Sequence, residues 1–442
     1  MFKTIANIFK IPDLRKKILF TTFILVLYRL GSFIPVPGVN VVALKAFFSN
    51  PGTDQILFGL YDLFVGGNFQ RASVFALGIM PYITTSIVIQ LLGSIVPYFE
   101  KLRKEGAEGQ KKINQLTRYG TVIIGGFNAI SIAFFLQNLE STGGQVVPVS
   151  GLFFIISTVI TLVTGTMMIM WLGEQITEKG IGNGISLIIF AGIIGRYPAG
   201  FWHLFQKVRL GETGIIRTLI FVALMVVVTA GVILVTEAVR KIPVQYAKRF
   251  VGRKMYGGHS TYIPLRVNSA GVIPIIFANS VIMFPRTIAM FAGGDSGSTF
   301  WVGLTNWLSP GHWFYTLIYV TLIVFFAYFY TAIVLNPVEM AENMKRYGGF
   351  IPGKKPGKKT SDYINNVIVR ITLPGAIFFA FIAILPDFMV KWGKIDFNFG
   401  GTGLIIIVGV ALDTLQQIES HLVMRHYDGF MKKGKLRGRS GR

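Results

Sequence analysis

The sequence predicts an all-helical protein that crosses a membrane ten times, as two five-helix halves of opposite orientation. Three observations support this fold class: the composition, the spacing of the apolar segments and a short internal repeat. Of the 442 residues, 52% are hydrophobic and 14% are charged, whereas charged residues make up roughly 25% of a typical soluble domain. These charged residues are too few to cover the surface of a soluble protein of this size. The lipid bilayer is therefore the expected solvent.

The apolar segments give the expected helices, because a membrane-spanning helix needs about 20 mostly apolar residues. Ten segments meet this requirement: 18–36, 72–93, 119–136, 152–172, 184–202, 215–236, 269–292, 313–335, 367–386 and 402–420. The fifth is the weakest, because its apolar run is short and follows Gly180-Ile-Gly-Asn-Gly184. The first is not a cleavable signal peptide, because it ends in Arg29 and Pro35-Val-Pro37 without a small-residue cleavage site.

The positive charges predict the orientation, because cytoplasmic loops are enriched in Lys and Arg. With residue 1 in the cytoplasm, 33 of the 43 Lys and Arg lie on the cytoplasmic side and 10 on the other. Both termini are therefore expected in the cytoplasm. Residues 1–17 are typical of a short interfacial helix, and residues 421–442 form a basic tail.

Two cytoplasmic loops, 237–268 and 336–366, are long and basic. Their charge has two interpretations. The loops can satisfy the orientation rule and attract anionic lipid, or they can dock a large anionic partner such as RNA or an acidic protein surface.

The second and seventh spans share a pattern that begins at Gly78-Ile-Met-Pro81 and Gly271-Val-Ile-Pro274. Three further pairs match in register: Ile83/Ile276, Val88/Val281 and Ile89/Ile282. Five spans separate the copies, so they run in opposite directions. This predicts two related halves, 18–202 and 203–420. The proline in each copy is expected to permit a kink beside a cavity.

Residue types that carry chemistry are sparse. The chain has no Cys, its five His are scattered, and no phosphate-binding or dinucleotide-binding loop is present. We therefore expect neither an enzyme nor a cofactor or metal site. Asp413, near Gln416 and Gln417, either bonds a neighbouring helix or binds a proton or cation, as a transporter would require.

Two further features have open interpretations. Residues 54–71 are too short to span, so they form either an interfacial helix or a re-entrant segment, and Gly66-Gly67 favours a movable piece. Isoleucines recur about one helical turn apart, which places each set on one helix face. They either pack or face lipid, or they form a functional stripe: Ile79, Ile83 and Ile87, and Ile185 and Ile189.

Several motifs, in order along the chain, carry a family resemblance: Arg29-Leu-Gly-Ser-Phe-Ile-Pro-Val-Pro-Gly38, Phe75-Ala-Leu-Gly-Ile-Met-Pro-Tyr-Ile83, Trp171-Leu-Gly-Glu-Gln-Ile-Thr-Glu178, Ala270-Gly-Val-Ile-Pro274, Tyr347-Gly-Gly-Phe-Ile-Pro-Gly353 and Val410-Ala-Leu-Asp-Thr-Leu415. Over essentially its full length the chain resembles the SecY family, the central channel subunit of the bacterial general secretory translocon. The resemblance implies an hourglass channel in the bacterial inner membrane. It opens across the membrane for secreted chains and sideways into lipid for membrane segments.

The resemblance also assigns residues to roles. The apolar ring at the waist would be Ile79, Ile83, Ile185, Ile189, Ile276 and Ile406. The plug of the resting channel would be about residues 57–68: Leu57, Phe58, Gly59, Leu60, Tyr61, Asp62, Leu63, Phe64, Val65, Gly66, Gly67 and Asn68. The sideways gate, between spans 2–3 and 7–8, would include Thr84, Gln90, Asn128 and Asn268.

The two basic loops would dock the ribosome, through its RNA, or the SecA motor ATPase. Their docking residues would be Lys248, Arg249, Arg253, Lys254, Lys354, Lys355, Lys358 and Lys359. The family usually has Arg where this chain has Lys355, so the charge is kept but bidentate contacts are lost. Other implied partners are the SecE and SecG subunits, unfolded preproteins with signal sequences, and membrane lipid.

Two alternatives to a channel follow from the same residues. An inverted-repeat secondary transporter would need Asp413 for ion coupling. An assembly scaffold would depend on the loop lysines but not on the bulk of Ile83 or Ile276.

Overall fold

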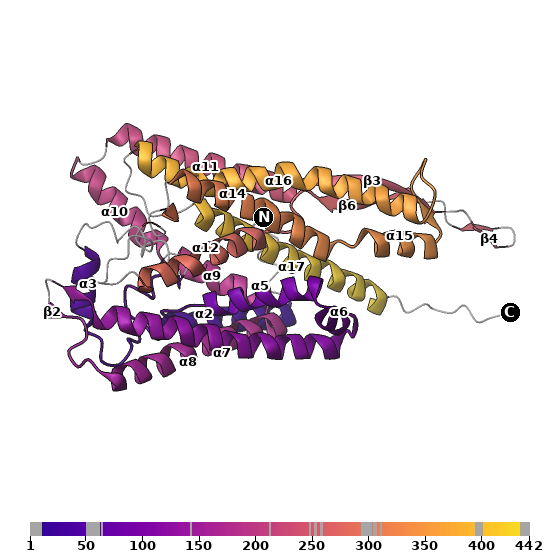
Figure 1. Ribbon diagram of the computed structural model, residues 1–442. Helices are drawn as coiled ribbons and strands as arrows, with labels where there is room; N and C mark the ends of the chain where they lie inside the picture. Colours follow the sequence, from indigo (N-terminus) through magenta and orange to yellow (C-terminus); the bar gives the residue numbers. More distant parts are fainter. Residues whose placement is uncertain are drawn as a thin grey trace. The chain divides into compact units, whose positions relative to one another are not determined.

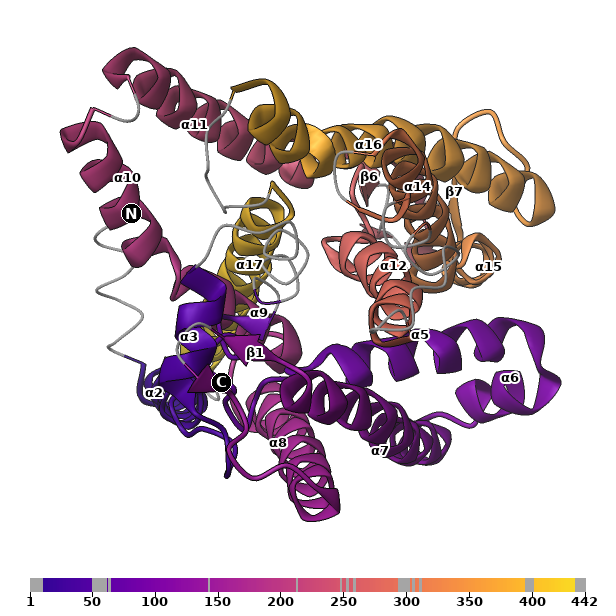
Figure 2. The same ribbon diagram turned by 60° about the vertical axis from the view of Figure 1, so that its left-hand side comes forward.

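The computed structural model describes residues 11–49, 62, 65–141, 144–211, 214–246, 249–251, 254–256, 260–292, 303, 307–309, 312–393 and 401–433. The chain divides into two compact units (Figures 1 and 2). One comprises Met1–Pro198 and Val410–Arg442, and the other comprises Ala199–Gly409. The expected half boundary at residues 202 and 203 stays a prediction.

The N-terminal unit is a bundle of helices with one short hairpin, β1 (Glu140–Ser141) and β2 (Gly144–Gln145). Its helices are α2 (Pro12–Gly31), α3 (Val41–Ser49), α5 (Met80–Ile95), α6 (Pro97–Lys104), α7 (Ala107–Gln137), α8 (Leu152–Lys179) and α9 (Gly184–Ile194). Helix α7 packs against both α5 and α8, as Figures 1 and 2 show. Glycine permits close approach, since a Cβ on Gly120 would overlap Thr85 and one on Gly165 would overlap the Val74 carbonyl.

The second unit combines helices with a small sheet. Its elements are α11 (Ile215–Glu237), β3 (Val239–Tyr246), β4 (Arg249–Val251), β5 (Lys254–Tyr256), β6 (Ser260–Arg266), α12 (Ile273–Ala292), α14 (Trp313–Val334), α15 (Pro337–Arg346), β7 (Gly349–Phe350) and α16 (Lys358–Gly393). Helix α14 packs against both α12 and α16. Two helices, α10 (Tyr197–Arg209) and α17 (Gly401–Lys433), run across the boundaries between the units.

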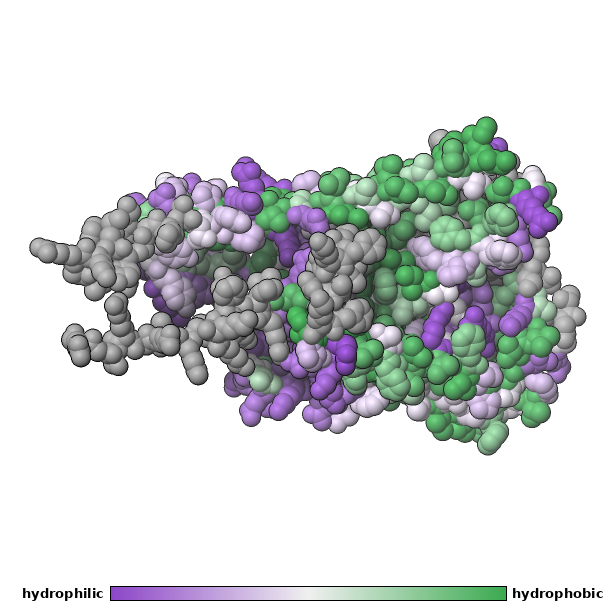
Figure 3. All heavy atoms as spheres, turned by 180° about the vertical axis from the view of Figure 1, so that it is seen from behind, coloured by the Kyte–Doolittle hydropathy of each residue, from purple (hydrophilic) through white to green (hydrophobic). Residues whose placement is uncertain are grey.

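The helical membrane class is confirmed, and each of the ten predicted spans overlaps a helix. Among the described residues, seven helices are long and apolar enough to cross a membrane, or up to eight when the pair α5 and α6, bent by 97°, counts as one span. Apolar side chains also stay exposed, most clearly on α11, where Ile216 is 75% exposed and Leu219 is 70% exposed. Figure 3 shows hydrophobic residues over much of the visible surface, which suits lipid acyl chains rather than water.

The second and seventh spans begin later than expected, because each follows a glycine in a left-handed conformation. Gly78 has φ +57° and Gly271 has φ +63°. Helices α5 and α12 start two residues further on and have Pro81 and Pro274 as their second residues. In the first turn a helical N–H has no intrahelical partner, so proline fits there without disruption. The prediction of a kink at these prolines is therefore wrong. The similarity of the two repeat copies nevertheless extends to the backbone, since both glycines are left-handed.

The fifth span is also divided. Helix α9 ends at Ile194, and α10 starts at Tyr197 after a break that contains Gly195 and Arg196. Eleven residues extend only about 16 Å, so α9 reaches span length only together with α10, as a segment of 26 residues. Of the expected interfacial helix at 1–17, residues 1–10 lie outside the described part, and α2 begins at Pro12.

The two long basic loops, 237–268 and 336–366, share one three-stranded sheet in the order β6-β3-β7. Strand β3 pairs antiparallel with β6 from Val239↔Arg266 to Gln245↔Ser260. It pairs with β7, from the other loop, at Gln245↔Phe350 and Tyr246↔Gly349. A hydrophobic core joins this sheet to α15 and α16: Ile242, Val244, Leu265, Met344, Ile351, Ile364 and Ile368.

Candidate functional site

Four of the six predicted ring isoleucines belong to the N-terminal unit. Ile79 immediately precedes α5 and Ile83 lies one turn later, where its N–H donates to the Ile79 carbonyl at 3.1 Å. Both side chains are buried, at 4% and 5% exposure. The positive φ of Gly78 turns the chain into α5, so this backbone geometry sets where the two isoleucines lie.

The other two, Ile185 and Ile189, lie on α9, whose position is set at its N-terminus. The Asn183 side chain caps the helix by accepting the N–H groups of Ile185 at 3.2 Å and Ser186 at 3.3 Å. A Cβ on Gly184 would overlap the Gly173 carbonyl of α8. Glycine therefore lets α9 lie directly on α8, which buries Ile189 and half-buries Ile185.

The second unit contributes Ile276 and Ile406. Ile276 lies in the first turn of α12, and its N–H donates to the Val272 carbonyl at 3.3 Å. A Cβ on Gly409 of α17 would overlap the Val272 side chain, so the start of α17 lies against the start of α12. Both isoleucines are buried, Ile276 at 6% and Ile406 at 0% exposure. That the six residues form one ring stays a prediction.

Of the predicted plug, Asp62 and residues 65–68 are described, and residues 57–61, 63 and 64 lie outside the described part. Asp62 is fully buried and forms an ion pair of 2.7 Å with Arg196. Burial raises the pKa of the Asp62 carboxyl above its ordinary value, while Arg196 opposes that effect. Asn68, also buried, donates to the Val65 carbonyl at 2.7 Å and to the Tyr28 hydroxyl at 3.3 Å.

The predicted gate residues lie in different surroundings. The Thr84 hydroxyl donates to the Met80 carbonyl at 3.1 Å, within α5. The Gln90 amide donates to the Ser86 hydroxyl of the same helix at 3.0 Å. Asn128 is half-buried on α7. These contacts belong to individual helices, and a gate role for the three residues stays a prediction.

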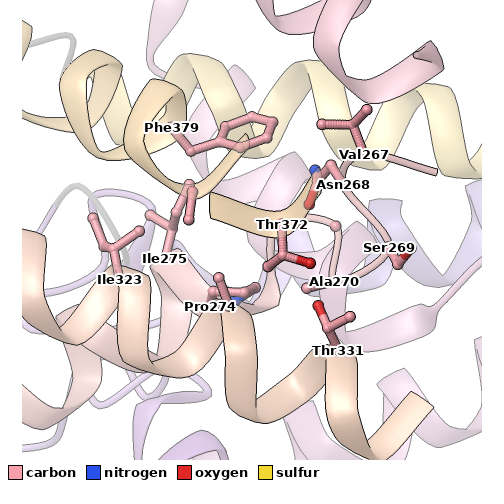
Figure 4. A pocket seen from close by; sticks show the side chains of 13 residues that line it. Val267, Asn268, Ser269, Ala270, Pro274, Ile275, Ile323, Thr331, Thr372 and Phe379 are labelled. Atoms are coloured by element: carbon pink, nitrogen blue, oxygen red, sulfur yellow. The ribbon is translucent and has the colours of Figure 1, made fainter. Parts of the chain in front are cut away.

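Asn268 lines a small pocket of the second unit, beside the loop that leads into α12 (Figure 4). The walls come from α12, α14 and α16, and Thr331 and Thr372 face the pocket with Asn268. The pocket volume is about 10 Å³, close to the minimum for one water molecule. The Thr372 hydroxyl donates to the Ile368 carbonyl of its own helix at 2.8 Å.

The predicted docking lysines of the second loop follow β7 directly. All four are exposed: Lys354, Lys355, Lys358 and Lys359. The Lys354 ammonium lies 5.3 Å from the centre of the Tyr363 ring, and the Lys355 carbonyl accepts the Thr360 hydroxyl at 2.9 Å. This segment is therefore held against the start of α16, while its four lysines stay exposed.

In the first loop, Arg249 starts β4 and Lys254 starts β5, which form a hairpin. Lys248 and Arg253 lie outside the described residues. The hairpin forms a sheet of its own and follows β3 in the sequence, and β3 pairs with β7 of the second loop.

The structure places two polar residues of the tenth predicted span, Gln417 and Asp413. Gln417 of α17 accepts the Gly182 N–H at 2.9 Å, so it helps to hold the turn before α9. Asp413 is exposed on α17. Sequence reasoning missed Arg196 and Arg29, which contact the plug segment; their only signal was a charge at the end of an apolar run.

Comparisons with known proteins agree on one family. The SecY family model matches residues 73–415. The protein translocase subunit SecY of Thermotoga maritima is 44% identical over 444 residues, covering 99% of this chain and 100% of that protein.

Two solved structures share the fold. One is of a SecY protein whose plug domain stabilises the closed state of the translocation channel and maintains a membrane seal. It has a TM-score of 0.66 and 19% identity over 92% of each chain. The other is Sec61 in the canine ribosome-channel complex, with a TM-score of 0.62 and 17% identity over 92% of this chain and 93% of that one.

Proposed function

Because this chain belongs to the SecY family, and is therefore a protein-conducting channel subunit and not an enzyme, we propose roles for its individual residues. The waist is Ile79, Ile83, Ile185, Ile189, Ile276 and Ile406. Residues 57–68 form the plug, and Thr84, Gln90, Asn128 and Asn268 tune the sideways gate. The transporter alternative is not favoured.

The observation that carries the ring proposal is the placement of these isoleucines. All but Ile406 lie near a helix start that a glycine, a proline or a capping side chain defines, and all but Ile185 are buried. A constriction lined only by isoleucine expels water, so it blocks ions without a charged gate. The side chains can move apart around a polypeptide, and the absence of fixed charge lets many sequences pass.

The shared sheet supports docking by the two basic loops. Exposed lysines at 354, 355, 358 and 359 follow the strand that joins both loops, so a partner can engage them on one rigid base. Positive charge attracts ribosomal RNA or an acidic motor surface. The ribosome partnership is in keeping with the ribosome-bound channel structure. SecA, and SecE and SecG as companion subunits, are further proposals.

The membrane location and orientation of the chain complete the proposal. The chain is a multi-pass membrane protein. We place it in the bacterial inner membrane with both termini in the cytoplasm, because 33 of its 43 Lys and Arg then lie inside. Its substrates are unfolded preproteins, whose signal sequences enter between helices beside lipid.

The natural absence of cysteine makes the pore test direct. A single Cys replaces Ile276, and a secretory precursor with one Cys is stalled partway through the channel. We expect a disulfide between them that requires a signal sequence, SecA and ATP. No disulfide, in a preparation that still binds SecA, would mean that the pore residues are misplaced.

A further inference from the structure

Beyond the ring and plug, one buried ion pair joins segments that are far apart in the chain. The Arg196 Nη1 lies 2.7 Å from the Asp62 Oδ2, and 134 residues separate the two. The Asp62 side chain is 0% exposed and the Arg196 side chain 24% exposed. Arg196 lies in the break between α9 and α10. Asp62 lies in the segment proposed as the plug.

The second carboxylate oxygen of Asp62 organises the chain that follows it. Asp62 Oδ1 accepts the N–H groups of Phe69 at 3.0 Å and Gln70 at 3.2 Å. The Asp62 carbonyl also accepts the Gly67 N–H at 2.9 Å. One carboxylate therefore both closes this turn and attaches it to Arg196, and each of its oxygens has a partner.

Two more contacts attach the same turn to its surroundings. Arg29 Nη1, at the end of α2, donates to the Gly66 carbonyl at 3.3 Å. Gly66 also packs against Gly192 of α9, so closely that a Cβ on Gly66 would lie 2.6 Å from the Gly192 Cα. The turn thus rests on α2 and α9, with no side chain between the two glycine backbones.

The arginines near Asp62 explain why its carboxylate is the contact whose loss should disturb this turn most. Among the described residues, Asp62 interacts electrostatically with Arg196 and Arg71, and Arg71 also interacts with Arg29. Of the three arginines, Arg196 and Arg71 interact directly with this single carboxylate. Its removal would leave like charges close together in a partly buried place, where repulsion is poorly screened.

We propose that Asp62 and Arg196 form a latch that positions the C-terminal end of the plug, Asp62 and residues 65–68, together with the following Phe69 and Gln70, against the end of α9. This inference rests on the plug role proposed above. The latch holds the resting position, and displacement of the plug requires the ion pair to exchange its partners for water. Asp62 and Arg196 are positioning residues that act through the plug and not through contact with the passing chain.

The test compares Asp62→Asn and Arg196→Gln with Arg196→Lys, which keeps the positive charge. Glu174→Gln is the matched control, because it breaks another ion pair of the same unit, Arg118–Glu174 at 2.6 Å. Each change is made in the full-length chain carrying Gln70→Cys as the only cysteine, reconstituted into liposomes. Two quantities are measured: the rate at which a water-soluble maleimide labels that cysteine, and the ion leak of the resting channel.

We expect Asp62→Asn and Arg196→Gln to raise the labelling rate about tenfold or more, since breaking a buried ion pair leaves an uncompensated charge. Arg196→Lys should restore most of the protection, and Glu174→Gln should leave labelling unchanged. Arg196→Gln alone decides the labelling result if Asp62→Asn fails to fold. Unchanged labelling in the folded variants would overturn the latch. Faster labelling without a larger leak would support the latch and contradict the plug role.

Discussion

The contact between Gly66 and Gly192 gives a prediction whose size follows from the structure. Gly66 has φ +76°, and a Cβ on it would lie 2.6 Å from the Gly192 Cα. Carbon atoms in contact are ordinarily about 3.5–4.0 Å apart. Gly66→Ala therefore requires the turn or α9 to move by about 1 Å, because both contacting groups are backbone.

Gly66→Ala carries two energetic costs, one from the left-handed backbone and one from overpacking. The variant Gly67→Ala separates them. A left-handed conformation costs a side-chain-bearing residue roughly 1–2 kcal/mol, and overpacking costs about 1–3 kcal/mol more. The neighbouring Gly67 has φ +85°, but a Cβ there would meet Arg196 only at 3.8 Å, an ordinary contact. Gly67→Ala therefore carries the backbone cost without the overlap.

The assay is ion leak through the resting channel in a planar bilayer, together with thermal unfolding of each variant. Gly66→Ala should raise the leak and lower the unfolding temperature more than Gly67→Ala does. Gly353→Ala is a second control, because Gly353 has φ +77° and no atom within 4 Å of a Cβ, so it should leave the leak unchanged. Equal leak in the Gly66 and Gly67 variants would refute the reasoning.

Three further predictions concern the ring, the sheet and the α9 cap. Serine at both Ile83 and Ile276 should wet the waist and let ions pass at rest; unchanged conductance in a planar bilayer would count against the ring. Ile242→Ala, at 2% exposure in the sheet core, should lower the free energy of unfolding by about 2–5 kcal/mol, whereas Val239→Ala, at 39% exposure, should cost far less; equal losses would show that this core does not stabilise the loops. Asn183→Ala should destabilise α9 by about 1 kcal/mol, and Asn183→Ser should retain most stability in the same denaturation; a serine variant as weak as alanine would contradict the capping role.

Local rules recovered much of the fold. Apolar runs predicted a helix for each of the ten spans, because a hydrocarbon environment requires every backbone hydrogen bond to be made within the helix. The matched Gly78/Pro81 and Gly271/Pro274 predicted two related spans, and both glycines have the same left-handed backbone. The helix boundaries were less accurate, since those glycines delay α5 and α12 beyond the first apolar residue.

For the candidate site, too, the sequence predicted some features and not others. The spacing of the isoleucines suggested the stripes, while the family resemblance supplied the ring as a set. Composition showed that the two long loops, 237–268 and 336–366, are basic. It did not show that β7 pairs with β3, because a two-residue strand such as Gly349–Phe350 has no periodicity from which pairing can be read.

By itself, the sequence determined the membrane class and the helical segments, and it predicted the side of the membrane on which most positive charge lies. These depend on composition and on neighbours within a few residues. Only the tertiary structure decided that Arg196 pairs with Asp62 across 134 residues, that Gly66 meets Gly192, and that two loops share one sheet. The physical reason is that such contacts depend on how helices pack, and no local rule relates residues so far apart along the chain.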